Sequence, residues 1–184
     1  MPENSGKELV PLEELRARAL VLSCAPVAAE NNPDTGLLVL RLGEEFYGIP
    51  ALLVQESLIG PQLAPLPLPP HFSPGIINLR GELIGAIDLA GLFGLPAGRD
   101  RSFAAVVRLG GLAAAFLADG AAGVEWLSAA DREPVLPTLP QEYALFFDGA
   151  FRSGGRLILQ LNIERVFSHP LLQSRRKGYT EESL

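Results

Sequence analysis

Residues 75–88, with the sequence GIINLRGELIGAID, contain two short apolar runs separated by a tight-turn signal. Residues 76–78 and 83–87 have the length of strands, and Arg80-Gly81 between them is a two-residue connection that favours a β-hairpin. Gly81 is the natural place for the positive φ that such a turn needs, because glycine has no Cβ. The stretch therefore predicts a β-hairpin and favours an all-β interpretation of its surroundings.

Two charged side chains stand among the apolar residues of this stretch, Arg80 at the turn and Asp88 after Ala86-Ile87. A charge embedded in apolar strands costs free energy unless a partner compensates it. One interpretation is an intramolecular ion pair or a hydrogen-bonded brace. The other is that Arg80 is displayed at a strand end as an interface anchor, a role in which arginine is enriched. Both interpretations can hold at once.

The strand pattern continues on both sides of this hairpin. Apolar runs flank turn signals at residues 43–45 and at Gly110-Gly111, which predicts two more strand–turn–strand units. The predicted strands occupy residues 37–42, 46–49, 103–109 and 112–117, with later ones at 124–127 and 157–161. Residues 51–58 continue as an apolar segment. Many short strands at close spacing are typical of an all-β barrel or sandwich.

Helices are short and few in this interpretation. Residues 88–94 predict a single helical turn that stops at Gly94, and residues 163–167 predict the start of a terminal helix. Six prolines between residues 61 and 74, and three more at 134–140, exclude regular structure there. A polyproline ligand is one interpretation of residues 67–70. Because basic flanks are missing, we prefer a rigid crossover connection.

The distribution of charges divides the chain into three segments. Residues 1–36 form an N-terminal extension that comprises an amphipathic helix and a linker at 31–36. Residues 37–173 form the main domain, and residues 174–184 form a polar C-terminal tail. The apolar residues that recur at helical spacing in the extension are Leu9, Leu12, Leu15, Ala19 and Leu22.

Composition excludes several classes of function. The 184 residues include 15 Lys and Arg against 21 Asp and Glu, a net charge of -6 that argues against a nucleic-acid binder. No apolar stretch reaches the roughly 18–20 residues that span a bilayer, so we expect no membrane insertion. Cys24 is the only cysteine, which favours an intracellular protein without disulfides. Residues 19–24 faintly resemble a lipoprotein cleavage site, but the charged residues before them oppose it.

Catalytic and metal-binding motifs are missing from the sequence. It contains no GxxxxGK[ST], GxGxxG, HExxH, CxxC or GxSxG pattern, so we expect no metal, no cofactor and no enzyme activity. His71 is most simply a loop residue, and His169 follows the terminal helix, where a positive charge is favourable. A small hydrolase built on Ser73, His71 and a distant acid is the weakest alternative, because no orienting partner is evident.

Seven short motifs in fixed order resemble a CheW domain, the adaptor of bacterial chemotaxis signalling arrays. The resemblance covers about residues 37–170. Its motifs are residues 42–49 (LGEEFYGI), 54–56 (VQE), 75–81 (GIINLRG), 87–89 (IDL), 93–94 (FG), 116–120 (FLADG) and 161–165 (LNIER). A single motif of this kind would be weak, whereas the ordered series is specific.

The resemblance implies an all-β fold of two small five-stranded, Src-homology-3-like β-barrels packed together, with short N-terminal and C-terminal helices. It implies a non-catalytic adaptor that couples the cytoplasmic tip of a methyl-accepting chemoreceptor to the regulatory domain of a CheA-type histidine kinase. We therefore expect a cytoplasmic, single-domain protein associated with membrane-proximal receptor arrays, without a receiver or kinase domain.

The resemblance also assigns residues to partners. Val54, Gly75, Asn78 and Arg80 match the receptor or array motif, and Glu56 matches a kinase-facing position. Two further residues match the motif as parts of the fold, Gly81 and Asp88. Asn78 shares that structural interpretation.

Departures from the family pattern motivate an alternative function. Ala90 stands where a basic residue is usual, and Leu58 replaces a position that is often polar. Gly85-Ala86 replaces the usual Pro-Val, and Gly123 and Trp126 are atypical of the later strand. The alternative is a divergent regulator that binds only one partner and modulates array assembly.

Overall fold

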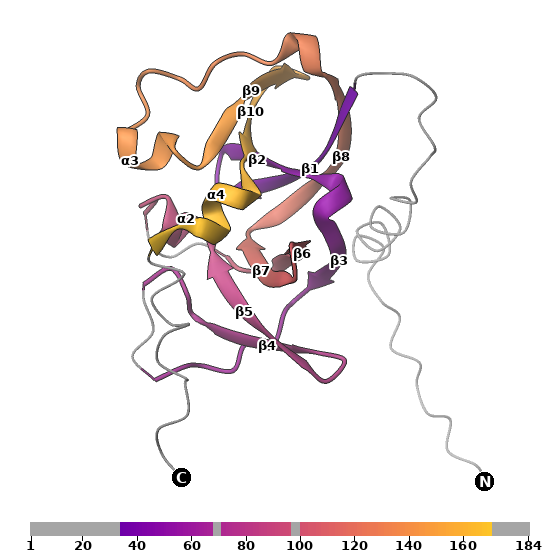
Figure 1. Ribbon diagram of the computed structural model, residues 1–184, viewed down its shortest axis with the longest axis vertical. Coiled ribbons are helices and arrows are strands. Elements are labelled where there is room, and N and C mark those ends of the chain that lie inside the picture. The colour runs from indigo at the N-terminus through magenta and orange to yellow at the C-terminus, as the bar shows by residue number, and fades with distance from the viewer. Residues whose placement is uncertain (1–33, 68–70, 97–99, 171–184) are drawn as a thin grey trace, which may run out of the picture. The chain divides into compact units, whose positions relative to one another are not determined.

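The computed structural model describes residues 34–67, 71–96 and 100–170 (Figure 1). The predicted N-terminal helix, linker residues 31–33, Cys24 and the polar tail lie outside these residues. Within them, ten strands form two five-stranded sheets, which confirms the predicted all-β fold. The strands are β1 (Asp34–Leu42), β2 (Glu45–Pro50), β3 (Val54–Ile59), β4 (Gly75–Leu79), β5 (Glu82–Asp88), β6 (Phe103–Leu109), β7 (Leu112–Ala118), β8 (Gly120–Ser128), β9 (Phe147–Ser153) and β10 (Arg156–Leu161).

The two sheets have the same internal plan. The first has the order β8-β1-β2-β10-β9 and the second the order β3-β6-β7-β5-β4. Each contains two antiparallel hairpins joined through one parallel pair, β2 with β10 in the first sheet and β5 with β7 in the second. The fifth strand of each sheet comes directly after a hairpin of the other sheet in the chain: β3 follows the β1–β2 hairpin, and β8 follows the β6–β7 hairpin. Neither sheet is therefore built from one continuous piece of chain.

Asp119 lies where the chain passes from the second sheet to the first, between β7 and β8. Its backbone N–H donates to the Arg41 carbonyl (3.0 Å), and its Oδ2 accepts from the N–H of Gly43 (2.6 Å). Both partners belong to the β1–β2 hairpin, with which β8 then pairs. The buried carboxylate thus joins the crossing point to the sheet that receives the next strand.

One strand of each parallel pair, β5 in the second sheet and β10 in the first, leads into a short helix with an Asx cap. Asp88 begins α2 (Leu89–Leu92) by accepting from the N–H of Ala90 (3.1 Å), and Asn162 begins α4 (Ile163–Ser168) by accepting from the N–H of Arg165 (2.8 Å). Such caps satisfy donors that the first helical turn leaves free. The helices predicted at 88–94 and 163–167 are confirmed. The remaining helical pieces are η1 (Ala51–Leu53), η2 (Ala129–Asp131) and α3 (Gln141–Ala144).

The hairpin predicted from residues 75–88 is confirmed. β4 and β5 pair antiparallel, and the turn has φ of 53° at Arg80 and 92° at Gly81. Two successive positive φ values suit the right-handed twist of the flanking strands. Asn78 Oδ1 accepts from the Gly81 N–H (2.8 Å) and closes the turn. Arg80 is the one non-glycine residue with positive φ among those described. Gly110-Gly111 forms the equivalent turn of β6–β7.

Two strand predictions needed correction. β1 begins at Asp34, so residues 34–36 are strand instead of linker, because Trp126 and its neighbours on β8 supply their pairing partners. β9 was missed altogether. Its sequence, FDGAFRS, contains glycine and charged residues, and it forms a strand through pairing with β10. In both cases pairing with another strand decides the local conformation.

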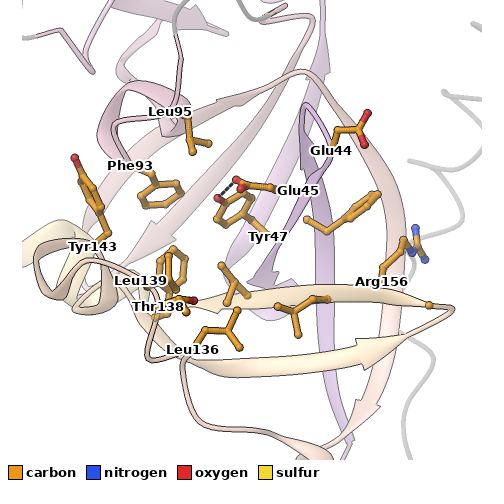
Figure 2. Close-up of a pocket in the computed structure, with 15 residues that line it drawn as sticks. Glu44, Glu45, Tyr47, Phe93, Leu95, Leu136, Thr138, Leu139, Tyr143 and Arg156 are labelled. Carbon is orange, nitrogen blue, oxygen red and sulfur yellow. Dashed lines mark hydrogen bonds between the residues drawn. The ribbon is translucent and has the colours of Figure 1, made fainter.

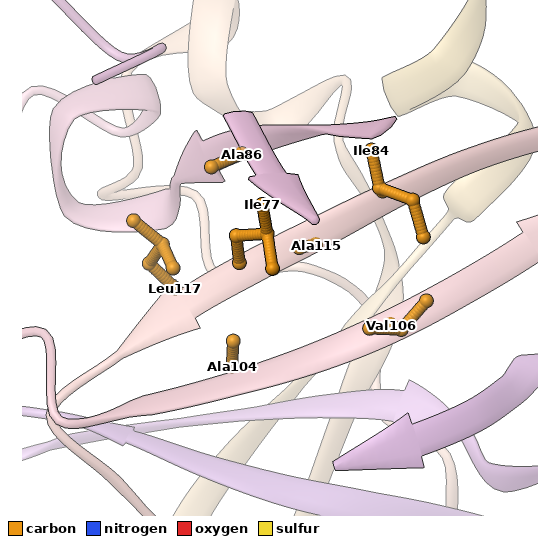
Figure 3. Packing of buried hydrophobic residues seen from close by; sticks show 7 residues of the cluster. All are labelled: Ile77, Ile84, Ala86, Ala104, Val106, Ala115 and Leu117. Atoms are coloured by element: carbon orange, nitrogen blue, oxygen red, sulfur yellow. The ribbon is translucent and has the colours of Figure 1, made fainter. Parts of the chain in front are cut away.

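Every second side chain along the strands of the second sheet points to its buried face, where these side chains pack together (Figure 3). Its core consists of small and branched residues on adjacent strands: Ile77, Ile84, Ala86, Ala104, Val106, Ala115 and Leu117. The corresponding core of the first sheet is Leu37, Val39, Phe151 and Ile158. Period-two burial of this kind holds the strand register, because a slip of one residue would turn these side chains to the other face.

Aromatic side chains connect the helices to the opposite sheets. Phe93, which ends α2 after the second sheet, stacks on Tyr47 of the first sheet, with ring centroids 5.1 Å apart. It also lies 5.2 Å from the ring of Phe147 on β9. In return, Phe167 of α4, which follows the first sheet, lies 6.0 Å from Phe116 of the second. The two sheets are therefore joined reciprocally.

No helix among the described residues is both long and apolar enough to cross a lipid bilayer.

Asp88 is the buried charge on which the second sheet's helix depends, since it is only 6% exposed. Arg101 Nε and Nη2 donate to its Oδ2 at 2.9 and 2.5 Å, while Oδ1 caps α2. We expect Asp88→Ala to lower the free energy of unfolding by about 2 kcal/mol, because the cap and the partner of Arg101 are lost together. Urea unfolding measures this. Arg152→Ala, which breaks the exposed pair with Glu133, is the control and should cost less than about 0.5 kcal/mol; equal losses would contradict the role of Asp88.

Candidate protein-interaction surface

The predicted partner residues meet at the two edges of the second sheet. β3 and β4 are its edge strands, and Arg80 stands at the β4–β5 turn with its side chain 79% exposed. Arg80 Nη2 donates to Oε1 of Glu56 on β3 at 3.0 Å. The structure thus brings together two residues that the sequence comparison assigned to different partners. Arg80 is both paired and displayed, so the two interpretations of its charge are compatible.

A second polar connection lies beside this ion pair. Arg108, near the end of β6, donates through Nε to Gln55 on β3 and through Nη2 to Glu82 on β5. We call these five side chains the seam cluster: Gln55, Glu56, Arg80, Glu82 and Arg108. Its two arginines and two glutamates sum to zero charge. The sequence analysis did not single out three of the five, Gln55, Glu82 and Arg108, although Arg108 lies two residues before the predicted Gly110-Gly111 turn.

The seam cluster covers one end of the second sheet's apolar core. Arg108 follows Val106 by two residues and so lies on the same side of β6 as that buried side chain. Leu79 and Ala113, which pack against the core, are only partly buried here.

Two exposed apolar side chains lie close in sequence to residues of the seam cluster. Leu83, opposite Asn78 in the β4–β5 register, is 66% exposed, and Leu52 of η1 is 91% exposed. Val54, the first residue of β3, is half-buried and pairs with Val107. Large exposed apolar residues beside paired charges are typical of protein-binding surfaces. Leu52 and Leu83 were not predicted, because sequence alone does not show which strand face is covered.

The other residues that match the motif each stabilise the fold through a contact that the structure describes. Asn78 is exposed, but its side chain closes the Arg80-Gly81 turn. Gly75 is buried, and a Cβ there would collide with the carbonyl oxygen of Ala64. That carbonyl accepts from the Ile76 N–H (2.9 Å), so it is fixed in place. Asp88 belongs to the cap and ion pair described above. The assignment of Gly75 and Asn78 to a partner stays a prediction.

A separate cavity of about 440 Å³ lies over β2 and β10 (Figure 2). In Figure 1 these strands are at the opposite end of the view from the β4–β5 turn. Tyr47, Phe93 and several leucines line it, and the Tyr47 hydroxyl donates to Glu45 Oε2 (2.7 Å). Arg156 at the rim lies over the Phe46 ring (5.0 Å) and pairs with Glu125.

The histidines of the described chain lie in separate places. His71 is exposed in the proline-rich connection, with its ring edge-on to Phe72. His169 ends α4, as predicted, and packs on Phe146 with ring centroids 5.0 Å apart. Among the described residues, no group of three or more His, Cys, Asp or Glu is arranged to hold a metal ion.

Comparisons with known proteins agree with one another. The family model described as CheW-like domain matches residues 36–171. The chain is 30% identical to a chemotaxis protein CheW of Treponema pallidum over 154 residues, 79% of this chain and 89% of that one. It is 30% identical to a chemotaxis protein CheW of Klebsiella aerogenes over 136 residues, 71% and 80% of the two chains. The crystal structure of the scaffolding protein TtCheW from Thermoanaerobacter tengcongensis superposes with a TM-score of 0.63 at 28% identity, covering 70% and 89%.

Gly75 offers a test that separates packing from partner contact. We expect Gly75→Ala to lower the free energy of unfolding by about 1–3 kcal/mol, since the new methyl group meets fixed backbone. Gly85→Ala is the matched control on the neighbouring strand, where a Cβ meets nothing within 4 Å, and it should change stability by less than about 0.5 kcal/mol. Urea unfolding of both variants decides. A Gly75→Ala variant as stable as Gly85→Ala would refute the steric explanation.

Proposed function

The chain belongs to the family of CheW-like domains, and on that premise we propose that it is a non-catalytic adaptor coupling chemoreceptors to a CheA-type histidine kinase in a chemosensory array. The observation that carries the proposal is the Arg80–Glu56 pair, displayed at the edge of the second sheet near exposed leucines. In this proposal the protein acts in the cytoplasm, beside receptors held in the membrane.

Each partner is assigned its own residues on this surface. The receptor tip contacts Arg80 and Val54, and the kinase regulatory domain contacts Glu56. Arg80 is suited to bind an acidic group because its guanidinium has donors left beyond the single bond to Glu56. The exposed Leu83 and Leu52 supply apolar area that a partner can bury, while the charges orient the contact.

The domain boundaries stay part of the proposal. We take residues 37–173 as the adaptor domain, with residues 1–36 as an extension and 174–184 as a tail. The strand residues 34–36 shift its start slightly toward the N-terminus.

The first test is direct binding. We expect Arg80→Ala to weaken binding to a chemoreceptor signalling fragment at least ~10-fold, and Glu56→Ala to do the same for the kinase regulatory domain, since central interface residues typically contribute about 2 kcal/mol or more. Surface plasmon resonance with immobilised partners measures both affinities. Arg152→Ala, at the exposed Arg152–Glu133 pair of the first sheet, is the matched control and should bind normally. If the unsubstituted chain binds neither partner, the proposal fails.

Kinase activation distinguishes the alternative, a divergent regulator that binds only one partner. The departures at Ala90 and Leu58 motivate it, although Ala90 is buried in α2 and so offers no surface. Mixing receptor, kinase and this chain should raise kinase autophosphorylation if the chain couples the two. A one-partner binder would instead inhibit activation by an established adaptor.

A further inference from the structure

The seam between the edges of the second sheet is crossed by side chains. β3 and β4 stand at opposite ends of the strand order and do not pair with each other, although Ala64, five residues after β3, forms an isolated bridge with Ile76 of β4. Two polar connections cross the gap: Arg80 to Glu56, and Arg108 to both Gln55 and Glu82. These contacts set the distance from β3 to the β4–β5 hairpin at the end where the predicted partner residues lie.

Arg108 differs from Arg80 in how it is held. Its side chain is 37% exposed and donates in two directions, to β3 and to the first residue of β5. Arg80 is 79% exposed and has one described side-chain partner. A guanidinium can make two such bonds at once because its donors lie in a rigid plane, whereas a lysine ammonium acts as a single point charge.

We propose that Arg108 is a positioning residue for receptor binding, which holds β3 and the β4–β5 hairpin at the spacing the receptor tip requires. The inference rests on the proposed function, in which the receptor contacts Val54 on β3 and Arg80 on the hairpin turn. These two contacts lie on opposite sides of the seam, so a receptor can engage both only while the spacing is kept.

The role of Arg108 follows from what a partner does to Arg80. An acidic group that binds Arg80 competes with Glu56 for the same guanidinium. While Arg80 is so engaged, the Gln55–Arg108–Glu82 connection is the side-chain link among the described residues that still spans the seam. Exposed ion pairs add little to global stability, so the effect of Arg108 belongs to local geometry and not to folding.

The experiment compares Arg108→Gln, Arg108→Lys and the control Arg152→Gln in the full chain. For Arg108→Gln we expect binding to a chemoreceptor signalling fragment to weaken about 5- to 10-fold, with a melting temperature within ~4 °C of the unsubstituted chain. Arg108→Lys restores the charge but not both bonds, so it should recover only part of the affinity. Adding Glu82→Gln to Arg108→Gln should cause no further loss, because both changes break one connection.

Hydrogen exchange of the free chain provides a readout that needs no partner. Amides of residues 75–88 should exchange faster in Arg108→Gln than in Arg152→Gln, since the hairpin then loses one of its two described side-chain links to β3 and keeps only that of Arg80. Unchanged exchange in this segment would overturn the inference.

The outcomes separate this inference from the function on which it rests. If the unsubstituted chain binds the receptor and Arg108→Gln binds as well as Arg152→Gln, the positioning role is wrong and the adaptor function stands. If affinity and melting temperature fall together, beyond the ~4 °C window, Arg108 acts on folding and the inference is overturned. If the unsubstituted chain binds no receptor, the function fails, and with it the role of Arg108 in binding.

Discussion

The exchange of fifth strands between the two sheets is the constraint on which the structure depends. β3 leaves the hairpin of the first sheet to pair with β6 of the second, and β8 leaves the hairpin of the second sheet to pair with β1 of the first. Each sheet is complete only when the other is present. The contacts of Asp119 with the β1–β2 hairpin lie at one of these crossings. There the buried carboxylate accepts a hydrogen bond from a backbone N–H of the hairpin.

The exchange also explains why the interaction surface lies where it does. Because β3 is supplied from the other sheet, its pairing with β6 leaves it at the edge of the second sheet, with the β4–β5 hairpin at the opposite edge. Side chains then complete the join, through the Arg80–Glu56 pair and the bonds of Arg108. Charged residues at strand edges also discourage unwanted strand pairing. The same polar groups that close the seam are thus available to a partner.

Much of the fold could be predicted from sequence because its signals are local. The Arg80-Gly81 and Gly110-Gly111 turns, the capped helix at Asp88 and the terminal helix after Asn162 each follow from a few adjacent residues. β9 could not be predicted, because its conformation comes from β10 and not from its own residues. Of the residues that match the family motif, Arg80, Glu56 and Val54 lie at the seam between the two edges of the second sheet, whereas Gly75 and Asp88 are buried, and the assignment of any of them to a partner stays a prediction. The bonds of Arg108 reach 53 residues back to Gln55 and 26 back to Glu82, which no local pattern encodes.

By itself the sequence determined the turns, most of the short strands, the two short helices and the resemblance to an adaptor family, because these depend on residue types at close spacing. Only the tertiary structure decided which strands pair, that Glu56 is the partner of Arg80 and that Leu52 and Leu83 are left uncovered. The physical reason is that pairing, burial and ion pairing depend on distances between residues far apart in the chain. These residues come close together only when each sheet has received its fifth strand from the other part of the chain.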